Sequence, residues 1–324
     1  VQPVVHGAAH RSAWTVRCKI GYSPSIERSR PTDALHHALL AEQLGFDSIW
    51  VDDHFLPVPH MTECGFAWTW MSSALQATDR VFFATAVTAP IMRYNPAVVA
   101  HAFATMGAMY PGRVGIGVGS GEELNEMAVV RGEWPHPGKR LEMLEEALSV
   151  MSKLWTSTVP TSFTGSYYTL TNASLFTRPE QPIPVYFSAI GPRASTMAGL
   201  LGDHLITVAR NPAVVRDVIF PNFEAGARKA GKDPKTMERA LAVLYFYDPD
   251  HLVDPEAMKV SASEAKIEVA GEGSQMELWH SAEDIIQRIE EWKRLGFDHL
   301  IFGNFSADCE AGLRVFEDVL PHVI

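Results

Sequence analysis

"LGFDSIWVDD" at residues 44–53 recurs in altered form as "LGDHLITVAR" at 201–210 and as "LGFDHLIFGN" at 295–304. Each copy joins a Leu-Gly pair to an aspartate and then to an apolar run that is typical of a buried strand. A helix that turns directly into a strand commonly ends on a left-handed residue, and glycine adopts that conformation without steric cost. The repeat therefore predicts three junctions at which a helix leads into a strand of a parallel sheet.

Strand-like runs alternate with helical periodicity along the rest of the chain, which predicts repeated βα units. Leu-Gly junctions would also suit a doubly wound sheet, but a count of eight units favours a closed (β/α)8 TIM barrel. The eight predicted strands lie at 18–22, 47–53, 81–88, 113–119, 183–189, 203–208, 240–247 and 298–304.

The domain organisation that we expect is a single α/β barrel over residues 18–324. Residues 1–17 have neither periodicity nor a hydrophobic signal core, so we interpret them as a poorly structured leader. Two segments, near 156–182 and 249–281, are too long for ordinary connections and are predicted insertions. The first has Gly165 between two short β-prone runs, which predicts a hairpin. The second is polar and is expected to be mobile.

The amino-acid composition limits the classes of partner that we expect the protein to bind. With 27 basic and 38 acidic side chains the net charge is −11, which disfavours nucleic acid and anionic membranes as partners. No apolar run approaches the roughly 20 residues that a membrane span needs. The three cysteines have no CxxC or Cys/His spacing, so we expect no disulfide, no metal site and a reducing cytoplasm.

Two predicted strand ends carry clusters of ionisable residues. One ends in Asp52, Asp53 and His54, and another runs into "GIGVGSGEELNE" at 115–126. In a parallel barrel the loops at the carboxyl ends of the strands form the active site, so these residues are candidates. Structural roles remain open, because aspartates cap turns and acidic residues favour the first turn of a helix. The glycine pattern alone is a weak signal, since neither a Walker lysine nor a Rossmann fingerprint follows it.

A family resemblance rests on five stretches, which are "IGYSPSIERSRPTDAL", "AEQLGFDSIWVDDHF", "RYNPAVVAHAFATMGAMYPGRVGIGVGSGEELNE", "SFTGSYYTL" and "IPVYFSAIGPRASTMAGLLGDHLITV". In these the chain resembles the luciferase-like F420-dependent oxidoreductases. It looks most like F420-dependent secondary alcohol dehydrogenase and F420-dependent glucose-6-phosphate dehydrogenase. The likeness extends over nearly the whole chain from about residue 18.

The resemblance implies a barrel of the bacterial luciferase-like type that binds the deazaflavin coenzyme F420, with FMN a less favoured cofactor. His54 matches the family's catalytic histidine, and Glu122 matches its catalytic glutamate. By the same matching, the residues that would line the cofactor ring are Asp53, Ser120, Gly121 and Asn125. The residues that would contact the tail of the cofactor are Ile190, Gly191, Arg193 and Ala194. Ala86 and Val87 fall where the family has a non-proline cis peptide behind the ring.

We hypothesise that neutral His54 accepts the proton of an alcohol while hydride leaves the carbinol carbon for C5 of the cofactor. Glu122 would manage the proton at a nitrogen of the deazaflavin ring.

The chain departs from the family at the expected substrate pocket. Val58 replaces a tryptophan four residues after the histidine, although His60 is retained. Either the substrate is bulkier, or Trp68 or Trp70 supplies the missing indole. At positions that bind phosphate in the sugar-phosphate enzymes this chain has Val208 and Asn211, which disfavours a phosphorylated sugar even though Arg210 lies between them.

The leading function is therefore hydride transfer between F420 and a secondary alcohol or sugar-like hydroxyl carbon of a small-molecule substrate. Three alternatives stay open. The first is redox-neutral epimerisation of a sugar or aminoglycoside-type hydroxyl, which needs a second acid such as His60 or Glu63. The others are an FMN-dependent monooxygenase and a non-catalytic protein that binds the cofactor. The family's habit makes a homodimer the expected assembly.

Overall fold

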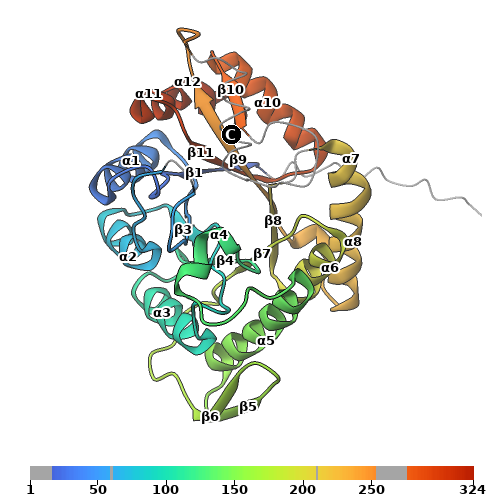
Figure 1. The fold of residues 1–324 in the computed structure, drawn as a ribbon. Coiled ribbons are helices and arrows are strands. Elements are labelled where there is room, and N and C mark those ends of the chain that lie inside the picture. Colours follow the sequence, from blue (N-terminus) through green and yellow to red (C-terminus); the bar gives the residue numbers. More distant parts are fainter. Residues whose placement is uncertain (1–16, 59–60, 209–210, 253–275) are drawn as a thin grey trace, which may run out of the picture.

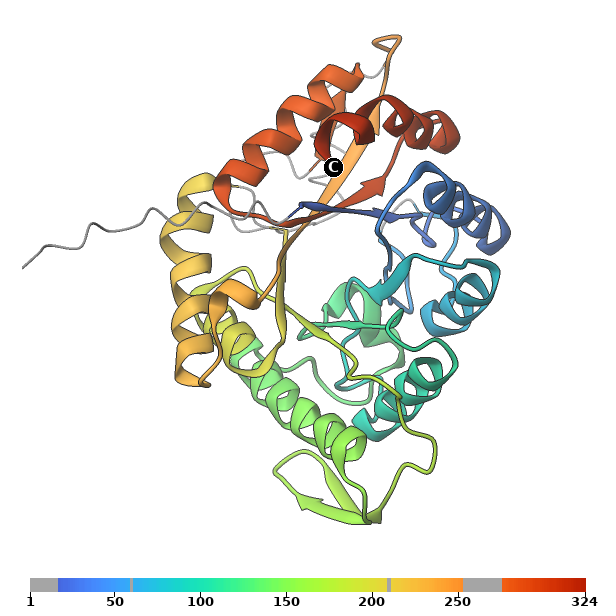
Figure 2. The ribbon, with the colours of Figure 1, turned by 180° about the vertical axis from the view of Figure 1, so that it is seen from behind.

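Eight parallel strands form a ring with the helices outside it, as Figures 1 and 2 show from opposite sides. The computed structural model describes residues 17–58, 61–208, 211–252 and 276–324. Around the ring the strands follow the order β3-β2-β1-β11-β9-β8-β7-β4. Isolated parallel bridges, Phe83 with Val114 and Thr88 with Val118, connect the two ends of this order. The predicted (β/α)8 barrel is therefore confirmed.

All eight predicted strands are present with small changes in their ends. The barrel strands are β1 (Lys19–Ser23), β2 (Ser48–Val51), β3 (Phe82–Thr85), β4 (Ile116–Val118), β7 (Val185–Ser188), β8 (His204–Thr207), β9 (Arg239–Tyr247) and β11 (His299–Asn304). The helices are α1 (Pro31–Leu44), α2 (Ala67–Ala77), α3 (Pro96–Met109), α4 (Glu123–Glu126), α5 (Pro137–Thr156), α6 (Pro192–Leu201), α7 (Pro212–Val214), α8 (Phe220–Lys229), α10 (Ala282–Leu295), α11 (Cys309–Arg314) and α12 (Phe316–Val323). Short helical turns are η1 (Met127–Val129), η2 (Val215–Ile219) and η3 (Pro234–Thr236).

The first predicted insertion contains the expected hairpin, formed by β5 (Thr161–Thr164) and β6 (Thr169–Ala173), and it projects outside the ring beside α5 (Figure 1). The carboxylate of Glu146 on α5 accepts backbone N–H groups of residues 166–168 at its turn. An unpredicted strand, β10 (Met276–Trp279), pairs in parallel with β9. Residues 1–16 of the proposed leader and 253–275 of the second insertion lie outside the described residues.

The three Leu-Gly junctions do not share one conformation. Gly45 and Gly296 have φ of 106° and 109°, the left-handed geometry that we predicted. Gly202 has φ of −81°, so the prediction is wrong there. Close packing requires this glycine instead, because a Cβ atom would lie 2.9 Å from both the Ala198 carbonyl oxygen and the Phe187 Cβ.

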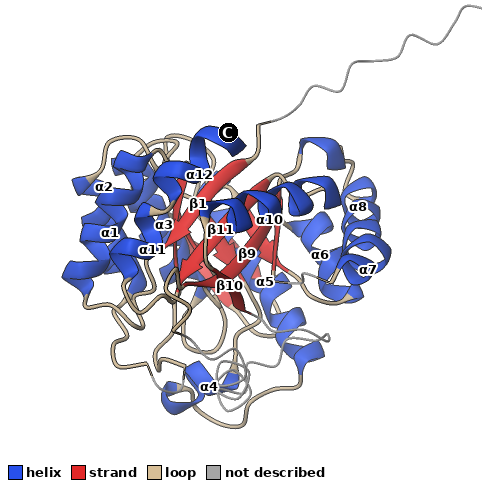
Figure 3. Ribbon diagram, turned by 90° about the horizontal axis from the view of Figure 1, so that it is seen from above, coloured by secondary structure: helices blue, strands red, loops and turns tan. Residues whose placement is uncertain are grey.

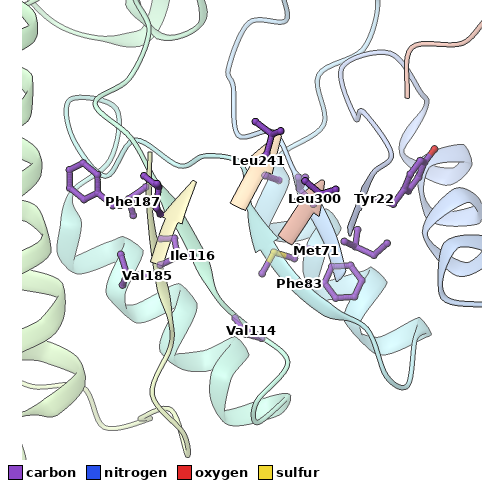
Figure 4. Packing of buried hydrophobic residues seen from close by; sticks show 14 of the residues in the cluster. Tyr22, Met71, Phe83, Val114, Ile116, Val185, Phe187, Leu241 and Leu300 are labelled. Atoms are coloured by element: carbon purple, nitrogen blue, oxygen red, sulfur yellow. The ribbon is translucent and has the colours of Figure 1, made fainter. Parts of the chain in front are cut away.

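Two apolar layers surround the strands. Outward-facing side chains such as Ile116, Phe187 and Leu241 join the large core between the strands and the helices (Figure 4). Inward-facing side chains form a separate cluster in which the rings of Trp50 and Tyr186 meet edge to face, with centroids 4.9 Å apart. Helices flank the strands on all sides, whereas α4 lies beyond one end of them (Figure 3). None of the helices described is long and apolar enough to span a membrane.

A polar network closes the barrel at the amino ends of its strands. His299 contacts Ser48 Oγ through Nε2 (2.8 Å) and Glu238 Oε2 through Nδ1 (3.1 Å). Tyr186 donates its hydroxyl to the same Glu238 oxygen at 2.7 Å, and Lys19 forms an ion pair with the other. Burial would raise the pKa of Glu238, but His299 and Lys19 hold it far below its usual range. The ionised carboxylate therefore stabilises the folded state.

Glu238→Gln should lower the free energy of unfolding by about 2–3 kcal/mol at pH 7, since it removes the charge that Lys19 and His299 pair with. The depressed pKa means that this contribution is complete above the unfolded-state pKa and fades as the pH falls below it. Urea unfolding should thus show a smaller difference from wild type at pH 4 than at pH 7. Glu310→Gln, on an exposed carboxylate, is the control, and equal stability of Glu238→Gln and wild type at pH 7 would contradict the role.

Candidate active site

The polar ends of four adjacent strands meet at the carboxyl edge of the barrel. Glu27 follows β1, and Asp52 to His54 follow β2. Arg93 lies in the loop after β3, and Glu122 and Glu126 lie in the segment after β4. These strands are neighbours in the ring, so residues up to 69 positions apart in the sequence contact one another here.

Small side chains line the barrel interior above Trp50 and Tyr186. Ala86 packs against the interior cluster, and Ser188 and Ala242 each follow an inward-facing residue by two positions, so they face the same way. All three are partly exposed, although Ser188 and Ala242 lie on strands of a closed ring and Ala86 directly follows one. These three small side chains are therefore not fully covered by other side chains.

His54 forms a short hydrogen-bonded pair with Glu27, a residue that the sequence analysis did not single out. Its Nδ1 lies 2.5 Å from Glu27 Oε1, and the two side chains are 22% and 6% exposed. Burial would lower the pKa of His54, but the hydrogen bond and charge of Glu27, with the charges of Asp52 and Glu122, raise it to about 9. His54 is therefore protonated at neutral pH, and among the described residues its Nε2 has no hydrogen-bond partner.

Asp53 is 1% exposed, and protein donors surround both oxygens of its carboxylate. Oδ2 accepts from Trp68 Nε1 at 3.1 Å and from Thr88 Oγ1 at 2.7 Å. Oδ1 accepts from Arg93 Nη2 at 3.0 Å and from the Tyr94 hydroxyl at 2.9 Å. Arg93 Nη2 also donates to the Asp53 carbonyl oxygen at 2.6 Å. The residue next to His54 is thus fixed to α2 and to the loop after β3.

Protein groups engage three of the residues that were predicted to line the cofactor or the substrate. Both carboxylate oxygens of Asp53 accept hydrogen bonds from protein donors. Trp68 is 6% exposed and donates its N–H to Asp53, while Trp70 is 7% exposed and donates to the Pro31 carbonyl oxygen at 2.9 Å. Neither indole therefore replaces the tryptophan that is missing at Val58.

The glycine-rich segment after β4 is fixed to the loop that carries His54. Asn125 Nδ2 donates to the Leu56 carbonyl oxygen, and the Leu56 N–H donates to the Asn125 carbonyl oxygen, both at 2.9 Å. Gly121 has φ of 74°, which an L side chain rarely adopts. Ser120 accepts Arg140 Nε through its carbonyl oxygen, and Glu122 is exposed without a hydrogen bond in the described part of the chain.

Glu126 is a second acid that the sequence did not single out. It is 2% exposed, and burial first, then the charges of Asp53 and Glu122, raises its pKa to about 7 against the opposing effect of Arg93. Its Oε1 lies 3.9 Å from Arg93 Nη2. Buried atoms without a hydrogen-bond partner gather here, namely Glu126 Oε2, Arg93 Nε and Asn125 Oδ1. A spare acceptor such as Asn125 Oδ1 can receive a donor from a bound ligand.

The Ala86–Val87 peptide bond is cis, as the resemblance implied. Val87 packs over β4, where a Cβ on Gly119 would lie 2.6 Å from Val87 Cγ2. At the start of α6, Ile190 is 41% exposed and Gly191 caps the helix without a side-chain bond. Arg193 and Ala194 occupy the first turn of that helix.

The remaining residues predicted for the substrate pocket form two groups, one beside the Glu27–His54 pair and one outside the described residues. The Val58 N–H lies 3.5 Å from Glu27 Oε2, and the Glu63 N–H donates to the Glu27 carbonyl oxygen at 3.0 Å. Both residues are therefore beside the Glu27–His54 pair. His60 and Arg210 lie outside the described residues. Within the described ranges no group of three or more His, Cys, Asp or Glu side chains is arranged to hold a metal ion.

The fold and the site together define a (β/α)8-barrel protein with an acid-rich site at the carboxyl ends of its strands. The chain belongs to the luciferase-like monooxygenase family, whose model matches residues 11–257.

Relatives named F420-dependent glucose-6-phosphate dehydrogenase are 38% identical in Amycolatopsis mediterranei and in Kribbella flavida, over 94% of this chain and 97–98% of theirs. A solved F420-dependent secondary alcohol dehydrogenase in complex with an F420-acetone adduct is 44% identical. Its TM-score is 0.88, over 95% of this chain and 99% of that one. A coenzyme F420-dependent tetrahydromethanopterin reductase from Methanopyrus kandleri, 19% identical with a TM-score of 0.75, shares the fold.

Asp53→Asn should lower the free energy of unfolding by about 3 kcal/mol, because Arg93 would remain buried beside an uncharged amide. Urea unfolding monitored by tryptophan fluorescence measures the change. Asp33→Asn, an exposed aspartate in the first turn of α1, serves as the control and should stay close to wild type. If Asp53→Asn and Asp33→Asn were equally stable, the Asp53 carboxylate would not stabilise the carboxyl edge of the barrel.

Proposed function

We propose that this protein is an F420-dependent oxidoreductase that transfers hydride between C5 of the cofactor and the carbinol carbon of a secondary alcohol or sugar-like substrate. The observation that carries the proposal is the Glu27–His54 pair at the carboxyl edge of the barrel. A histidine with a free Nε2 and an oriented Nδ1 is suited to exchange a proton with a substrate oxygen. The named activities of relatives at 38% and 44% identity support the choice of cofactor.

The residues present are compatible with a deazaflavin. The small, partly exposed side chains of Ala86, Ser188 and Ala242 leave space for a ring, and Asn125 Oδ1 offers an unused acceptor. The exposed Ile190 and Arg193, beside the helix start at Gly191, would contact the anionic tail. When bound, F420 supplies a ring carbon that accepts or donates hydride. Ser120, Gly121 and Ala194 remain proposed contacts on the strength of the family pattern.

The raised pKa of His54 refines our hypothesis about its role. With a pKa of about 9 the imidazole is charged at neutral pH, so it is ready to donate a proton to a carbonyl oxygen during reduction. For alcohol oxidation His54 must first lose that proton, and the neutral form that we hypothesised prevails above about pH 9. Glu122, which is exposed near His54, remains our candidate for managing the proton at the ring nitrogen.

The substrate that we propose carries no phosphate. Val208 is apolar and 39% exposed, and Asn211 uses its side-chain oxygen to cap α7 by accepting the Ala213 N–H at 2.9 Å. Neither provides the charged partner that a phosphate prefers. Because Trp68 and Trp70 are both occupied in the core, the space left by Val58 favours a bulky substrate.

Two alternatives have less support. Epimerisation needs a second acid, for which Glu63 is the described candidate. The flavin-dependent monooxygenase alternative rests on solved structures such as the 16% identical Baeyer-Villiger enzyme with FMN, and such a likeness supports only a common fold.

His54→Gln should reduce turnover at least about 100-fold while F420 binding, followed by cofactor fluorescence, is retained, because the variant keeps the shape but cannot transfer the proton. In wild type, carbonyl reduction by reduced cofactor should fall as the pH rises through about 9, and alcohol oxidation should rise. A panel of secondary alcohols, sugars and amino sugars, with stereochemical analysis of recovered alcohol, separates oxidation from epimerisation. Full activity of His54→Gln would refute the assignment.

We further propose a homodimer that forms through α2 and α3. Neither helix contains an Asp, Glu, Lys or Arg residue, although a fifth of the chain is charged. On the outer face of α3, Val98 is 57% exposed and Met109 is 58% exposed. An uncharged surface of two neighbouring helices is suited to contact with a second copy. The three cysteines are free, and a reducing cytoplasm remains the location that we propose.

The double substitution Val98→Glu and Met109→Glu should convert a dimer into monomers, because it would bury two carboxylates in the interface. Sedimentation velocity measures the outcome. Ala225→Glu, on the exposed face of α8, is the control and should leave the sedimentation coefficient unchanged. A double variant that sediments as wild type does would place any interface elsewhere.

A further inference from the structure

Arg93 lies between two buried carboxyl groups at the carboxyl edge of the barrel. Its Nη2 atom donates to the Asp53 carbonyl oxygen at 2.6 Å and to Asp53 Oδ1 at 3.0 Å, and the same atom lies 3.9 Å from Glu126 Oε1. The side chains of Arg93, Asp53 and Glu126 are 7%, 0% and 2% exposed. The segments that follow β2, β3 and β4 therefore meet in a buried cluster of two carboxyl groups and a single guanidinium group.

Hydrogen bonding assigns the negative charge of this cluster to Asp53. Each of its carboxylate oxygens faces an N–H group that can only donate, namely Trp68 Nε1 at Oδ2 and Arg93 Nη2 at Oδ1. The Thr88 and Tyr94 hydroxyl groups occupy the second position at these oxygens. A proton on either oxygen would displace a donor, so Asp53 and Arg93 form the ion pair and their charges cancel.

Glu126 has no such set of donors. Its Oε2 atom is buried without a hydrogen bond, and the 3.9 Å from Oε1 to Arg93 is too long for one. Two other cations act on Glu126, but His54 is paired with Glu27, and Arg140 donates to backbone carbonyl oxygens at 2.9 and 2.7 Å. An ionised Glu126 would thus be a buried charge without a hydrogen bond or an uncommitted cation among the described residues, a state that folded proteins rarely contain.

The electrostatic surroundings of Glu126 agree with this assignment. Burial first, and then the charges of Asp53 and Glu122, raises its pKa to about 7, although Arg93 and His54 act in the opposite direction. The described titratable or charged groups that interact with Glu126 are Asp53 and His54 after β2, Arg93 and Tyr94 after β3, Glu122 in its own segment, and Arg140 on α5.

We infer that Glu126 is a positioning residue that is uncharged while the cluster is intact, and that loss of its proton loosens the hold of Arg93 on Asp53. An ionised Glu126 competes with Asp53 for the same guanidinium group and repels the Asp53 carboxylate. Asp53 directly precedes His54, so the proton on Glu126 helps to keep the catalytic candidate in place. The inference concerns the protein without cofactor and therefore does not depend on the proposed function.

The indole N–H of Trp68 donates to Asp53 Oδ2, so its NMR signal reports on the cluster. In protein with 15N-labelled tryptophan this signal is assigned by its loss in Trp68→Phe, or by its nuclear Overhauser contact with the Tyr94 ring, whose centroid lies 4.4 Å away. In wild type the signal should shift as the pH rises through about 7 and Glu126 loses its proton. Glu126→Gln keeps the shape of the side chain without its charge and should reduce the shift by more than half.

Glu123→Gln removes a charge from an exposed neighbour and is the control, which should shift as wild type does. Equal shifts of the Trp68 signal in wild type and Glu126→Gln would overturn the inference. If the glutamine variant does not fold, as judged by circular dichroism, Glu126→Met removes the same charge from a side chain of similar length and decides the question in the same way.

Urea unfolding provides the second test. A carboxyl group whose pKa is raised in the folded state contributes stability that is complete below the unfolded-state pKa and is lost as the pH rises through the folded-state value, here about 7. Glu126→Gln has no proton to lose, so its urea midpoint should rise relative to that of wild type between about pH 5 and pH 8. A difference between the two midpoints that stays constant over this range, as a merely structural role predicts, would also overturn the inference.

Discussion

A carboxylate that is 1% exposed is stable only where other donors replace the water it has lost, and Asp53 receives four side-chain hydrogen bonds. These donors come from α2 and from the end and following loop of β3, so the carboxylate joins three segments at one point. His54 is the next residue along the chain. The position of the catalytic candidate therefore depends on the buried charge of the residue beside it.

Several acidic side chains lie near Asp53 and His54 in the candidate active site. Glu27, Asp52, Glu122 and Glu126 all act on or near His54, and burial raises the pKa of two of them, Asp52 and Glu126, to about 7. The arrangement stabilises an imidazolium ion and leaves protons on buried carboxyl groups near neutrality. These properties support our proposal that the site delivers a proton to a substrate oxygen while a cofactor supplies hydride.

The fold itself does not choose between the chemistries of its family. A coenzyme F420-dependent reductase and a Baeyer-Villiger monooxygenase in complex with FMN share this barrel at identities of 19% and 16%, so the barrel supports several reactions. The argument for hydride transfer therefore depends on the site and on the relatives of higher identity. The small residues above Trp50 and the Glu27–His54 pair are the structural part of that argument.

Local patterns in the sequence determined the barrel. Eight apolar runs that alternate with helical segments predict eight strands, and the glycines at 45 and 296 end helices in the left-handed conformation that we expected. The position of His54 at a strand end was also readable, because strand ends follow from the same periodicity.

Only the tertiary structure decided which side chains meet. Glu27 pairs with His54 across 27 residues, and Arg93 reaches Asp53 across 40, because adjacent parallel strands bring their carboxyl ends together. Periodicity places a residue on a strand or helix but carries no information about its partner on the next one. For that reason the sequence did not show that Trp68 is buried and donates to Asp53, or that Gly202 is required by packing and not by a left-handed turn.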